Sequence, residues 1–455
     1  MKTWSRYSWQ DFKRTQSPHW YSDAVLEDSI SQLSQLPALV FAGETRSLIN
    51  DLKEVSQGRA FLLQCGNCAE NFADCNGPKI HNFIRILLQM SIIISFIGNK
   101  KVVKVGRIAG QYAKPRSSET EQINGISLPV YKGDMVNSFE SDPEKRKHDP
   151  ARMIDGYFRS AATLNLIRAF TKGGYASLDQ IRDWQRHYFS DYPIMEKYQT
   201  VASELISAIN FIKTLKLDVN NTVFSEVDLY TSHEALLLEY EAAMTRVDTT
   251  TGLYYDTSAH MVWVGERTRQ PDGAHIEFLR GVNNPVGMKV GPDYDIDNIL
   301  NNIQRLNPDN LPGKVCLIVR FGIKKVEKLL TSLIHAVRKH GLQVVWICDP
   351  MHGNTYVSGT GKKARKLDDI LEEIGIFFQV HKSEGSMAGG VHLELTGDNV
   401  TECIGGKSNI SESDLNSNYT STCDPRLNAE QSVELAFFVA QLLRKSLCPE
   451  VGVNG

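Results

Sequence analysis

The sequence predicts an α/β protein built on a (β/α)₈ TIM barrel, and two observations lead to this fold class. Eight short apolar runs rich in Val, Ile and Leu recur along the chain without polar alternation, as in parallel strands buried on both faces. A side chain that can bind a metal or an anion stands at or just past the end of each run, on the face where such barrels place their active sites. The runs are residues 61–66, 102–106, 223–230, 261–265, 286–290, 315–319, 344–347 and 390–394. The side chains are Cys68, Arg107, His233, Glu266 with Arg267, Lys289, Arg320, Asp349 with His352, and Glu394.

The residues around these runs divide the chain into an extension and a catalytic barrel. Residues 1–57 precede the first strand and form an N-terminal extension, in which we expect a helix over residues 45–55. Residues 58–450 form the barrel. The connection between its second and third strands is far longer than a usual crossover, so residues 118–220 are interpreted as a helical insertion.

Helix signals within the insertion support this division. Asp149 and Pro150 open a helix that ends at Gly173, and the spacing from Ser177 to Gln180 is typical of a capping box that begins a second helix. Residues 134–148 are strongly charged and are expected to form a mobile loop.

Composition narrows the classes of function. The formal net charge of −3 gives no broad positive field for nucleic acid or an anionic membrane. The most apolar stretch, residues 86–97, is too short to cross a bilayer and is expected to be a buried helix. The first residues lack the apolar core of a secretory signal, so we expect a cytoplasmic protein whose eight cysteines are reduced.

Four side chains that are distant in sequence form a candidate metal site: Cys68, His352, Glu394 and Asp424. A thiolate, an imidazole and two carboxylates suit a divalent transition metal rather than calcium. We expect one ion, Mn²⁺ or Co²⁺ first, with Fe²⁺ and Zn²⁺ as alternatives.

Each of these residues also has a structural interpretation. A free cysteine is commonly a small core side chain, and a single His or Glu is usually structural or solvated. Cys65 and Cys68 have the spacing of half a zinc knuckle, but no second pair completes it. If Cys68 and Asp424 share an ion, Cys423 lies near Cys68, and oxidation could join the two cysteines and disable the site.

Six cations follow the strands closely enough to indicate two anionic substrates rather than one, since a phosphate takes about two or three such donors. They are Arg107, Lys114, Arg116, Arg267, Lys289 and Arg320. The alternative is a set of solvated surface charges. Residues 358–363 do not match a P-loop and residues 385–390 precede a strand, so neither ATP nor NAD is implied.

Long motifs carry a resemblance to one family. Together they strongly resemble type II 3-deoxy-D-arabino-heptulosonate 7-phosphate (DAHP) synthases over about residues 4–443. The motifs are QCGNCAE at 64–70, VKVGRIAGQYAKPRS at 103–117, VGERTRQ at 264–270, DPMHGN at 349–354, GVHLELTG at 390–397 and TCDPR at 422–426. One departure is Cys65-Gly-Asn67, where family members commonly have Gly-Gly-Asp; the metal cysteine itself is retained.

The resemblance implies condensation of phosphoenolpyruvate with D-erythrose 4-phosphate, the first step of the shikimate pathway to chorismate and the aromatic amino acids. It implies metal binding by Cys68, His352, Glu394 and Asp424. It places phosphoenolpyruvate among Arg107, Glu266, Arg267, Lys289 and Arg320, with Glu266 acting through its backbone. It assigns the aldehyde substrate to Lys114, Arg116 and Ser117. For proton donation to the new alkoxide we select Lys114; the group that activates water stays unassigned.

Two other functions remain open on sequence alone. A metal-dependent aldolase would use the same Lewis acid on one phosphorylated substrate without releasing phosphate. A regulatory barrel that has lost catalysis would turn nothing over. In the family the extension and the insertion serve subunit contacts and feedback inhibition, so we expect a homo-oligomer, dimer or tetramer, and an aromatic amino acid effector. Stabilising decoration is the alternative.

Overall fold

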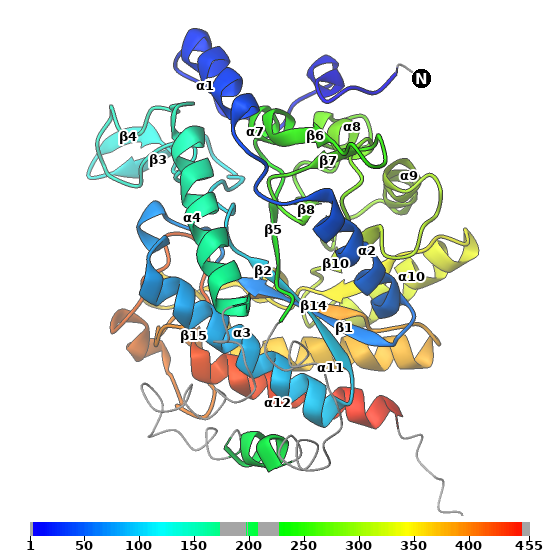
Figure 1. Cartoon of the computed structure of the whole chain (residues 1–455). Helices are drawn as coiled ribbons and strands as arrows, with labels where there is room; N and C mark the ends of the chain where they lie inside the picture. Colours follow the sequence, from blue (N-terminus) through cyan, green and yellow to red (C-terminus); the bar gives the residue numbers. More distant parts are fainter. Residues whose placement is uncertain (1–2, 173–196, 198, 208–226, 448–455) are drawn as a thin grey trace, which may run out of the picture.

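Eight parallel strands close into a barrel in the computed structural model, which describes residues 3–172, 197, 199–207 and 227–447 (Figure 1). Around the barrel the strands follow the order β1, β14, β11, β10, β9, β8, β5, β2. The TIM barrel predicted from the apolar runs is therefore confirmed. The strands are β1 (Ala60–Gly66), β2 (Lys101–Arg107), β5 (Tyr230–Glu234), β8 (Met261–Val264), β9 (Val286–Val290), β10 (Val315–Val319), β11 (Val345–Cys348) and β14 (Gly390–Glu394).

Helices follow the strands and form the outer layer, as the strand–helix rhythm predicts. In Figure 1, α3 and α12 lie side by side, and these two helices pack closely along their lengths. The helices are α3 (Gly77–Gly98), α7 (Leu238–Met244), α8 (Ala274–Leu279), α9 (Ile296–Leu306), α10 (Val326–Lys339), α11 (Leu367–Ser383) and α12 (Ala429–Leu447).

The third barrel strand is not where the apolar run placed it. The strand β5 begins at Tyr230, whereas the prediction over residues 223–230 was wrong: residues 227–229 lie outside any strand and residues 223–226 fall outside the described residues. The strand contains polar Thr231, Ser232 and His233, which are all buried. Each has a polar partner, Thr231 on His260, Ser232 on Gln64 and Nε2 of His233 on Glu241, so burial here does not require apolar side chains.

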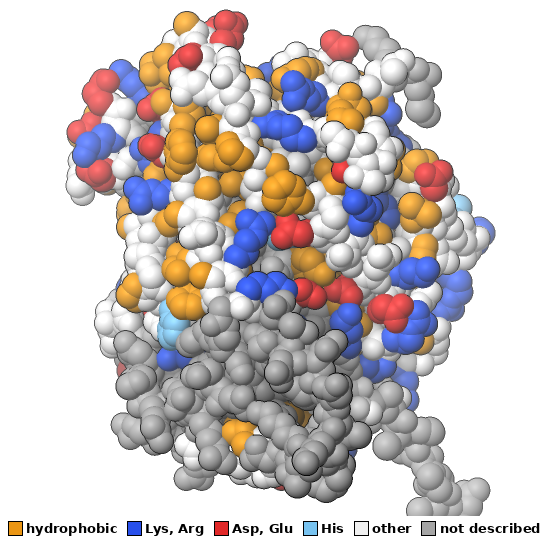
Figure 2. Space-filling model, in the orientation of Figure 1, with side chains coloured by type: hydrophobic (Ala, Val, Ile, Leu, Met, Phe, Trp, Pro, Cys, Tyr) orange, Lys and Arg blue, Asp and Glu red, His pale blue; other side chains and the backbone are white. Residues whose placement is uncertain are grey.

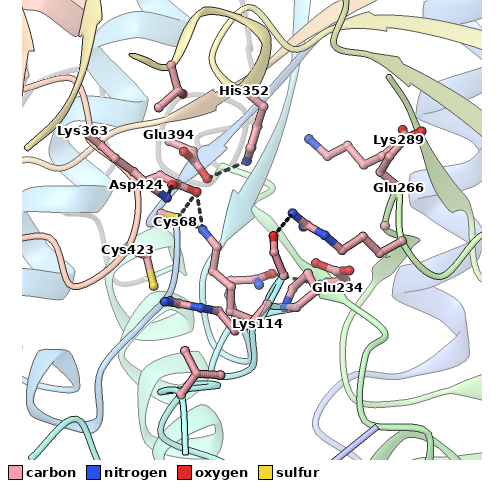
Figure 3. A pocket seen from close by; sticks show the side chains of 18 of the residues that line it. Cys68, Lys114, Glu234, Glu266, Lys289, His352, Lys363, Glu394, Cys423 and Asp424 are labelled. Atoms are coloured by element: carbon pink, nitrogen blue, oxygen red, sulfur yellow. Dashed lines mark hydrogen bonds and ion pairs between the residues drawn. The ribbon is translucent and has the colours of Figure 1, made fainter. Parts of the chain in front are cut away.

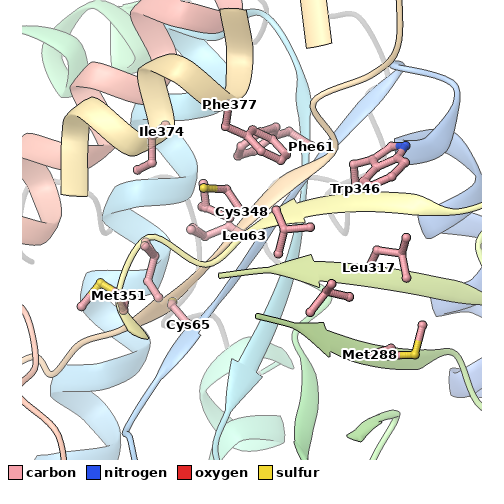
Figure 4. Close-up of a cluster of buried hydrophobic side chains, with 14 of the residues drawn as sticks. Phe61, Leu63, Cys65, Met288, Leu317, Trp346, Cys348, Met351, Ile374 and Phe377 are labelled. Atoms are coloured by element: carbon pink, nitrogen blue, oxygen red, sulfur yellow. The ribbon is translucent and has the colours of Figure 1, made fainter. Parts of the chain in front are cut away.

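Strand residues alternate between two apolar layers, which explains why the runs lack polar alternation. In β1, Phe61 and Leu63 face outward and pack in a cluster that includes Phe377 of α11 (Figure 4). Between them, Leu62 faces the inside of the barrel, in a cluster that contains Val105. Both faces are thus buried.

The N-terminal extension closes one end of the barrel. Its elements are η1 (Ser8–Asp11), α1 (Asp23–Gln35) and α2 (Ala42–Ser56), and the last contains the helix expected over residues 45–55. Buried Leu48, Leu52 and Val55 of α2 pack into the inner apolar cluster near the beginnings of the strands. This plug leaves the opposite, C-terminal end of the barrel open.

The insertion begins with a hairpin of β3 (Thr120–Ile123) and β4 (Ile126–Pro129), which the sequence did not indicate, and continues into the expected helix α4 (Arg152–Lys172). The second expected helix, from Ser177, lies outside the described residues. The loop 134–148 contains a buried guanidinium, Arg146, which binds Glu121 of β3 over 2.5 Å. Shorter elements are η2 (Phe72–Asp74), β6 (Thr245–Val247), β7 (Tyr254–Asp256), η5 (His352–Asn354), β12 (Tyr356–Val357), β13 (Lys363–Lys366), β15 (Cys403–Ile404) and η6 (Glu412–Asn416).

Of the helices in the described part of the chain, α3 is the one long and apolar enough to span a membrane by length and composition. Within its most apolar window, 67% of the residues are buried inside the protein, as the stretch 86–97 predicted.

Candidate active site

A cavity of about 420 Å³ opens at the C-terminal ends of the barrel strands. All twelve residues that the sequence assigned to metal binding, substrate binding or proton transfer line it, whereas His233 and Asp349, the other two side chains noted at strand ends, do not. They come from strand ends and the loops that follow, so the parallel barrel brings together side chains far apart in sequence. Figure 3 shows that the thiol and the two acids gather on one side of this cavity, and Lys289 and Glu266 lie on the other.

Three of the proposed metal ligands converge directly. The donor atoms of Cys68, Glu394 and Asp424 all lie within 4.8 Å of one another, and the Cys68 Sγ is 3.5 Å from Oδ2 of Asp424. The fourth, His352, joins through Glu394, because its Nε2 is 3.2 Å from Oε1 of that carboxylate. The arrangement brings soft and hard donors around one point, as a transition metal requires.

A positive charge already stands in this donor set. The ammonium of Lys114 contacts the sulfur of Cys68 and lies 2.6 Å from Oδ2 of Asp424. Burial raises the pKa of Asp424, but Lys114, Arg365 and His352 together hold that pKa well below its usual range. Burial lowers the pKa of Lys114, but Asp424 and Cys68 oppose this and raise it well above its usual value, so the ammonium stays charged. A site that holds an ammonium this way has the charge and the donors to fit a divalent cation.

Asp349 fixes the orientation of the His352 ring through the nitrogen that does not face Glu394. Its Nδ1 lies 2.7 Å from Oδ2 of Asp349, whose carboxylate also binds the ammonium of Lys289. Burial raises the pKa of Asp349, but His352 and Lys289 lower it well below its usual range. An ionised carboxylate accepts a hydrogen bond from Nδ1–H and leaves the Nε2 lone pair facing Glu394, the arrangement that metal-binding histidines use.

A buried chain of hydrogen bonds anchors Arg107. The guanidinium donates to Nε2 of His392 over 2.6 Å, and Nδ1 of His392 donates to Oε1 of Gln64 over 2.8 Å. The amide of Gln64 then donates to the hydroxyl of Ser232 over 3.0 Å. Arginine carries only donors, so this series of hydrogen bonds can run in one direction only. His392 must therefore accept at Nε2 and donate at Nδ1, which makes the ring neutral. A second nitrogen of Arg107 contacts Glu394 at 3.1 Å.

The remaining predicted substrate residues form the opposite wall. The carboxylate of Glu266 is occupied by Arg269 and by the backbone N–H of Gly291, so its side chain belongs to the wall rather than to a ligand. The guanidinium of Arg267 donates to the hydroxyl of Ser117 over 2.9 Å, which joins the two predicted substrate sets. The Nε of Arg320 is buried without a partner.

The sequence missed several groups around the cavity. Glu234 ends β5 and lines the cavity, whereas His233, chosen instead, faces away and binds Glu241. Arg365 of β13 is fully buried and contacts Glu394 at 2.7 Å, and Lys363 contacts Asp424 at 2.7 Å. The third strand was predicted to end four residues too early, so Glu234 was not seen as a strand end, and β13 lies in the connection between β11 and β14, where no barrel strand was expected.

A family model and named relatives match nearly the whole length of this chain. Residues 4–440 match the model of the class-II DAHP synthetase family. A Streptomyces coelicolor protein named phospho-2-dehydro-3-deoxyheptonate aldolase is 47% identical, over 96% of this chain and 97% of its own. A Neurospora crassa protein of the same name is 44% identical, over 97% of this chain and 95% of its own. A solved DAHP synthase from Thermotoga maritima is 16% identical, with a TM-score of 0.37, over 84% of this chain and 69% of its own. The chain belongs to the class-II DAHP synthetase family.

Proposed function

We propose that this chain condenses phosphoenolpyruvate with D-erythrose 4-phosphate and water, giving 3-deoxy-D-arabino-heptulosonate 7-phosphate and inorganic phosphate. The observation that carries the proposal is one cavity in which a cation-binding set of a thiol and two acids faces a wall of Lys and Arg side chains. A reaction between two phosphorylated substrates needs such a wall, since the anions must be held close together. Family membership supports the same reaction, the first step of the shikimate pathway.

Each substrate has its own cations. Phosphoenolpyruvate lies against Arg107, Lys289 and Arg320, which are anchored at strand ends or directly after them. Erythrose 4-phosphate lies against the loop of Lys114, Arg116 and Ser117, and Arg267 joins the two sets through its bond to Ser117. The cations neutralise two phosphates and a carboxylate, which lowers the barrier to bringing the substrates together.

A divalent metal belongs to this proposal, held by Cys68, His352, Glu394 and Asp424. When bound, it supplies Lewis-acid polarisation of the aldehyde oxygen. The mixed donors suit Mn²⁺ or Co²⁺, with Fe²⁺ and Zn²⁺ as alternatives.

Lys114 is proposed as the proton donor. The C3 carbon of phosphoenolpyruvate forms a bond to the aldehyde carbon, and the aldehyde oxygen takes a proton from the Lys114 ammonium. An ammonium is acidic enough to protonate an alkoxide, and its place beside both the metal ligands and the aldehyde loop suits this step.

Glu234 is proposed as the base that activates water. Among the described carboxylates lining the cavity, it is the one with a buried oxygen, Oε1, that has no hydrogen-bond partner. A Cβ at Gly265 would lie 2.1 Å from this oxygen, so the glycine leaves the room that the carboxylate occupies. Burial raises the pKa of Glu234, although Lys114 and Lys289 lower it in part. A raised pKa improves a carboxylate as a base.

Lys114 and Glu234 together account for the proton transfers of the reaction. After carbon–carbon bond formation, water bonds to C2 of the former enol and gives one proton to Glu234. The resulting hemiketal phosphate collapses: its hydroxyl becomes the ketone, the C2–O bond to phosphate breaks, and the hydroxyl proton leaves with the phosphate. The proton on Glu234 returns through solvent to Lys114, so the enzyme is restored.

The test is phosphate release by purified, metal-loaded protein. We expect release that needs both substrates and stops with a chelator. Release of no phosphate with cleavage of one sugar phosphate would identify an aldolase, and no turnover at all would identify a regulatory barrel. Glu234→Gln tests the base: we expect kcat to fall about 100-fold, with the KM values little changed.

Assembly, regulation and location complete the proposal. Exposed Tyr21, Phe41 and Phe158 lie on or beside α1, α2 and α4, and hydrophobic side chains gather over these elements in Figure 2, which supports a homo-oligomer, dimer or tetramer. A cavity of about 710 Å³ between α3 and α12 offers both Phe437 and charged Arg444, as an aromatic amino acid effector would need. We also propose that residues 1–57 form an extension and residues 58–450 form the catalytic barrel, with its insertion at 118–220. We propose a cytoplasmic location for the protein.

A further inference from the structure

A buried carboxylate gathers three backbone N–H groups beside the proposed metal ligand. Glu70 lies two residues after Cys68 and is 4% exposed. Its Oε1 accepts from the N–H of Ala109 over 3.0 Å. Its Oε2 accepts from the N–H of Gly110 over 3.0 Å and of Gln111 over 2.8 Å. Successive backbone N–H groups aimed at one anion form a nest, here with the anion supplied by the chain itself.

The backbone turn that follows β2 carries a conformational free-energy cost. Ala109 has φ of 62°, in the left-handed region that a residue with a Cβ occupies at a free-energy cost. Through this turn the backbone leaves β2 and leads to Lys114, Arg116 and Ser117. The N–H of Ala109 is one of those that Glu70 accepts, so the carboxylate stabilises the turn in the conformation that is costly for alanine.

The same contacts extend to a third strand end. The backbone N–H of Glu70 donates to the carbonyl of Gln111 over 2.8 Å. The side chain of Gln111 accepts from the N–H of Glu234 over 2.9 Å and donates to the carbonyl of Ala113 over 3.1 Å. Glu70 thus ties the segment after β1 to the loop after β2, and through Gln111 to the end of β5.

We propose that Glu70 is a positioning residue that sets the aldehyde-substrate loop against the sulfur of Cys68. The inference rests on the proposed function for the identity of the substrates. Glu70 lies outside the cavity lining and acts through the backbone of residues 109–111. Lys289 is held by Asp349, and Arg107 is held by His392 as well as by the carbonyls of Asn67 and Cys68, so we expect the phosphoenolpyruvate side to depend on Glu70 less than the aldehyde loop does.

Glu70→Gln tests the inference, since the amide keeps the size but replaces one acceptor oxygen with a donor. We expect kcat/KM for erythrose 4-phosphate to fall about 10- to 100-fold, as for loss of charged hydrogen bonds, while KM for phosphoenolpyruvate changes less than about three-fold. Glu277→Gln is the matched control: Glu277 is buried and binds Arg280 outside the cavity. Glu277→Gln should lower the free energy of unfolding but leave the ratio of the KM values for phosphoenolpyruvate and erythrose 4-phosphate unchanged.

A second substitution separates positioning from general damage. Glycine adopts a φ of 62° without the cost that alanine bears, so Ala109→Gly in the Glu70→Gln background should restore kcat/KM for erythrose 4-phosphate about five-fold. Ala109→Gly alone should not raise it. Absence of rescue, or an equal rise in both KM values, would overturn the inference.

Hydrogen exchange gives a readout that does not depend on turnover. In the wild-type protein the N–H groups of residues 109–111 are bonded and buried, and we expect slow exchange in peptides covering residues 108–117. Glu70→Gln should accelerate exchange in these peptides and leave those of β9 unchanged. If wild-type protein fails to turn over but this difference appears, the proposed reaction is wrong and the positioning role stands. If exchange is unchanged in Glu70→Gln, the positioning role is wrong whatever the reaction.

Discussion

The guanidinium of Arg107 donates to Nε2 of His392 across 2.6 Å, so the imidazole receives rather than gives the proton in this bond. Burial lowers the pKa of His392 well below its usual range, and Lys289 and Arg107 lower it further. The ring is therefore a neutral acceptor over the working pH range. It orients an arginine that also contacts the proposed metal ligand Glu394, and so connects the wall of Lys and Arg side chains to the proposed metal site.

Removing this acceptor should weaken phosphoenolpyruvate binding. In His392→Leu, one nitrogen of Arg107 loses its partner, and we expect KM for phosphoenolpyruvate to rise at least about ten-fold, since a hydrogen bond to a charged group contributes about 1.5–3 kcal/mol. KM for erythrose 4-phosphate should change little. His392→Gln is the matched variant, because its amide can both accept from Arg107 and donate to Gln64, and it should recover part of the loss. Equal KM values for the leucine and wild-type proteins would contradict this role.

Lys289 should give phosphoenolpyruvate capture an alkaline limit. Burial lowers the pKa of Lys289 to about 8, with Asp349 opposing the shift. Below that pH the ammonium is charged and attracts the substrate; as pH rises through about 8 it loses its proton and its charge. We expect kcat/KM for phosphoenolpyruvate to fall above pH 8, about ten-fold per pH unit.

Lys289→Arg is the control for this pH dependence. A guanidinium stays charged far above pH 8, so the alkaline fall should disappear even if the absolute rate is lower. The rates are measured at saturating metal and saturating erythrose 4-phosphate. The same fall in both proteins would assign it to another group.

The barrel was predictable because its signal is local. A run such as residues 315–319 is apolar at every position, since one face packs on helices and the other fills the barrel, and the structure places β10 over Val315–Val319. The third strand lacked this signal. Ser232 is buried by virtue of a bond to Gln64, 168 residues away in the chain, and no local pattern records such a partner.

The residues of the candidate site likewise divide into those that a local sequence pattern reveals and those that it does not. Cys68 and Glu394 could be selected because each lies at or just after a strand end, where a barrel gathers its chemistry. Arg365 could not, although it is buried against Glu394, because the extended segment that carries it lies outside the barrel. Glu234 was missed for a simpler reason, a strand prediction that ended four residues early.

Asp349 should control metal affinity without being a ligand. It holds Nδ1 of His352, and partners of this kind typically contribute about 10- to 100-fold to metal affinity. We therefore expect Asp349→Asn to raise the dissociation constant for Mn²⁺ within that range in a direct titration. Asp398→Asn is the control, since Asp398 binds Lys79 outside the cavity, and its metal affinity should match the wild type. Unchanged affinity in Asp349→Asn would show that His352 needs no carboxylate to orient it.

Oxidation should disable the metal site through Cys423. Cys68 and Cys423 are both free thiols in the structure, and Cys68 together with the Lys114 ammonium lowers the pKa of Cys423 to about 6 against the opposing effect of burial. Near neutral pH, peroxide would convert the Cys423 thiolate to a sulfenic acid, which the Cys68 thiol would attack to form a disulfide and water. The metal then loses its thiolate ligand. We expect release of Mn²⁺ and loss of two free thiols, both reversed by dithiothreitol.

Two serine variants make this prediction specific. Cys423→Ser has no thiolate to oxidise, so it should keep its metal under the peroxide treatment that empties the wild-type site. Cys75→Ser is the control, because Cys75 is also a partly exposed thiol but binds the carbonyl of Arg159 outside the cavity, and this variant should remain as sensitive as the wild type. Metal retained by oxidised wild-type protein, or released equally from Cys423→Ser, would show that the two thiols do not form this switch.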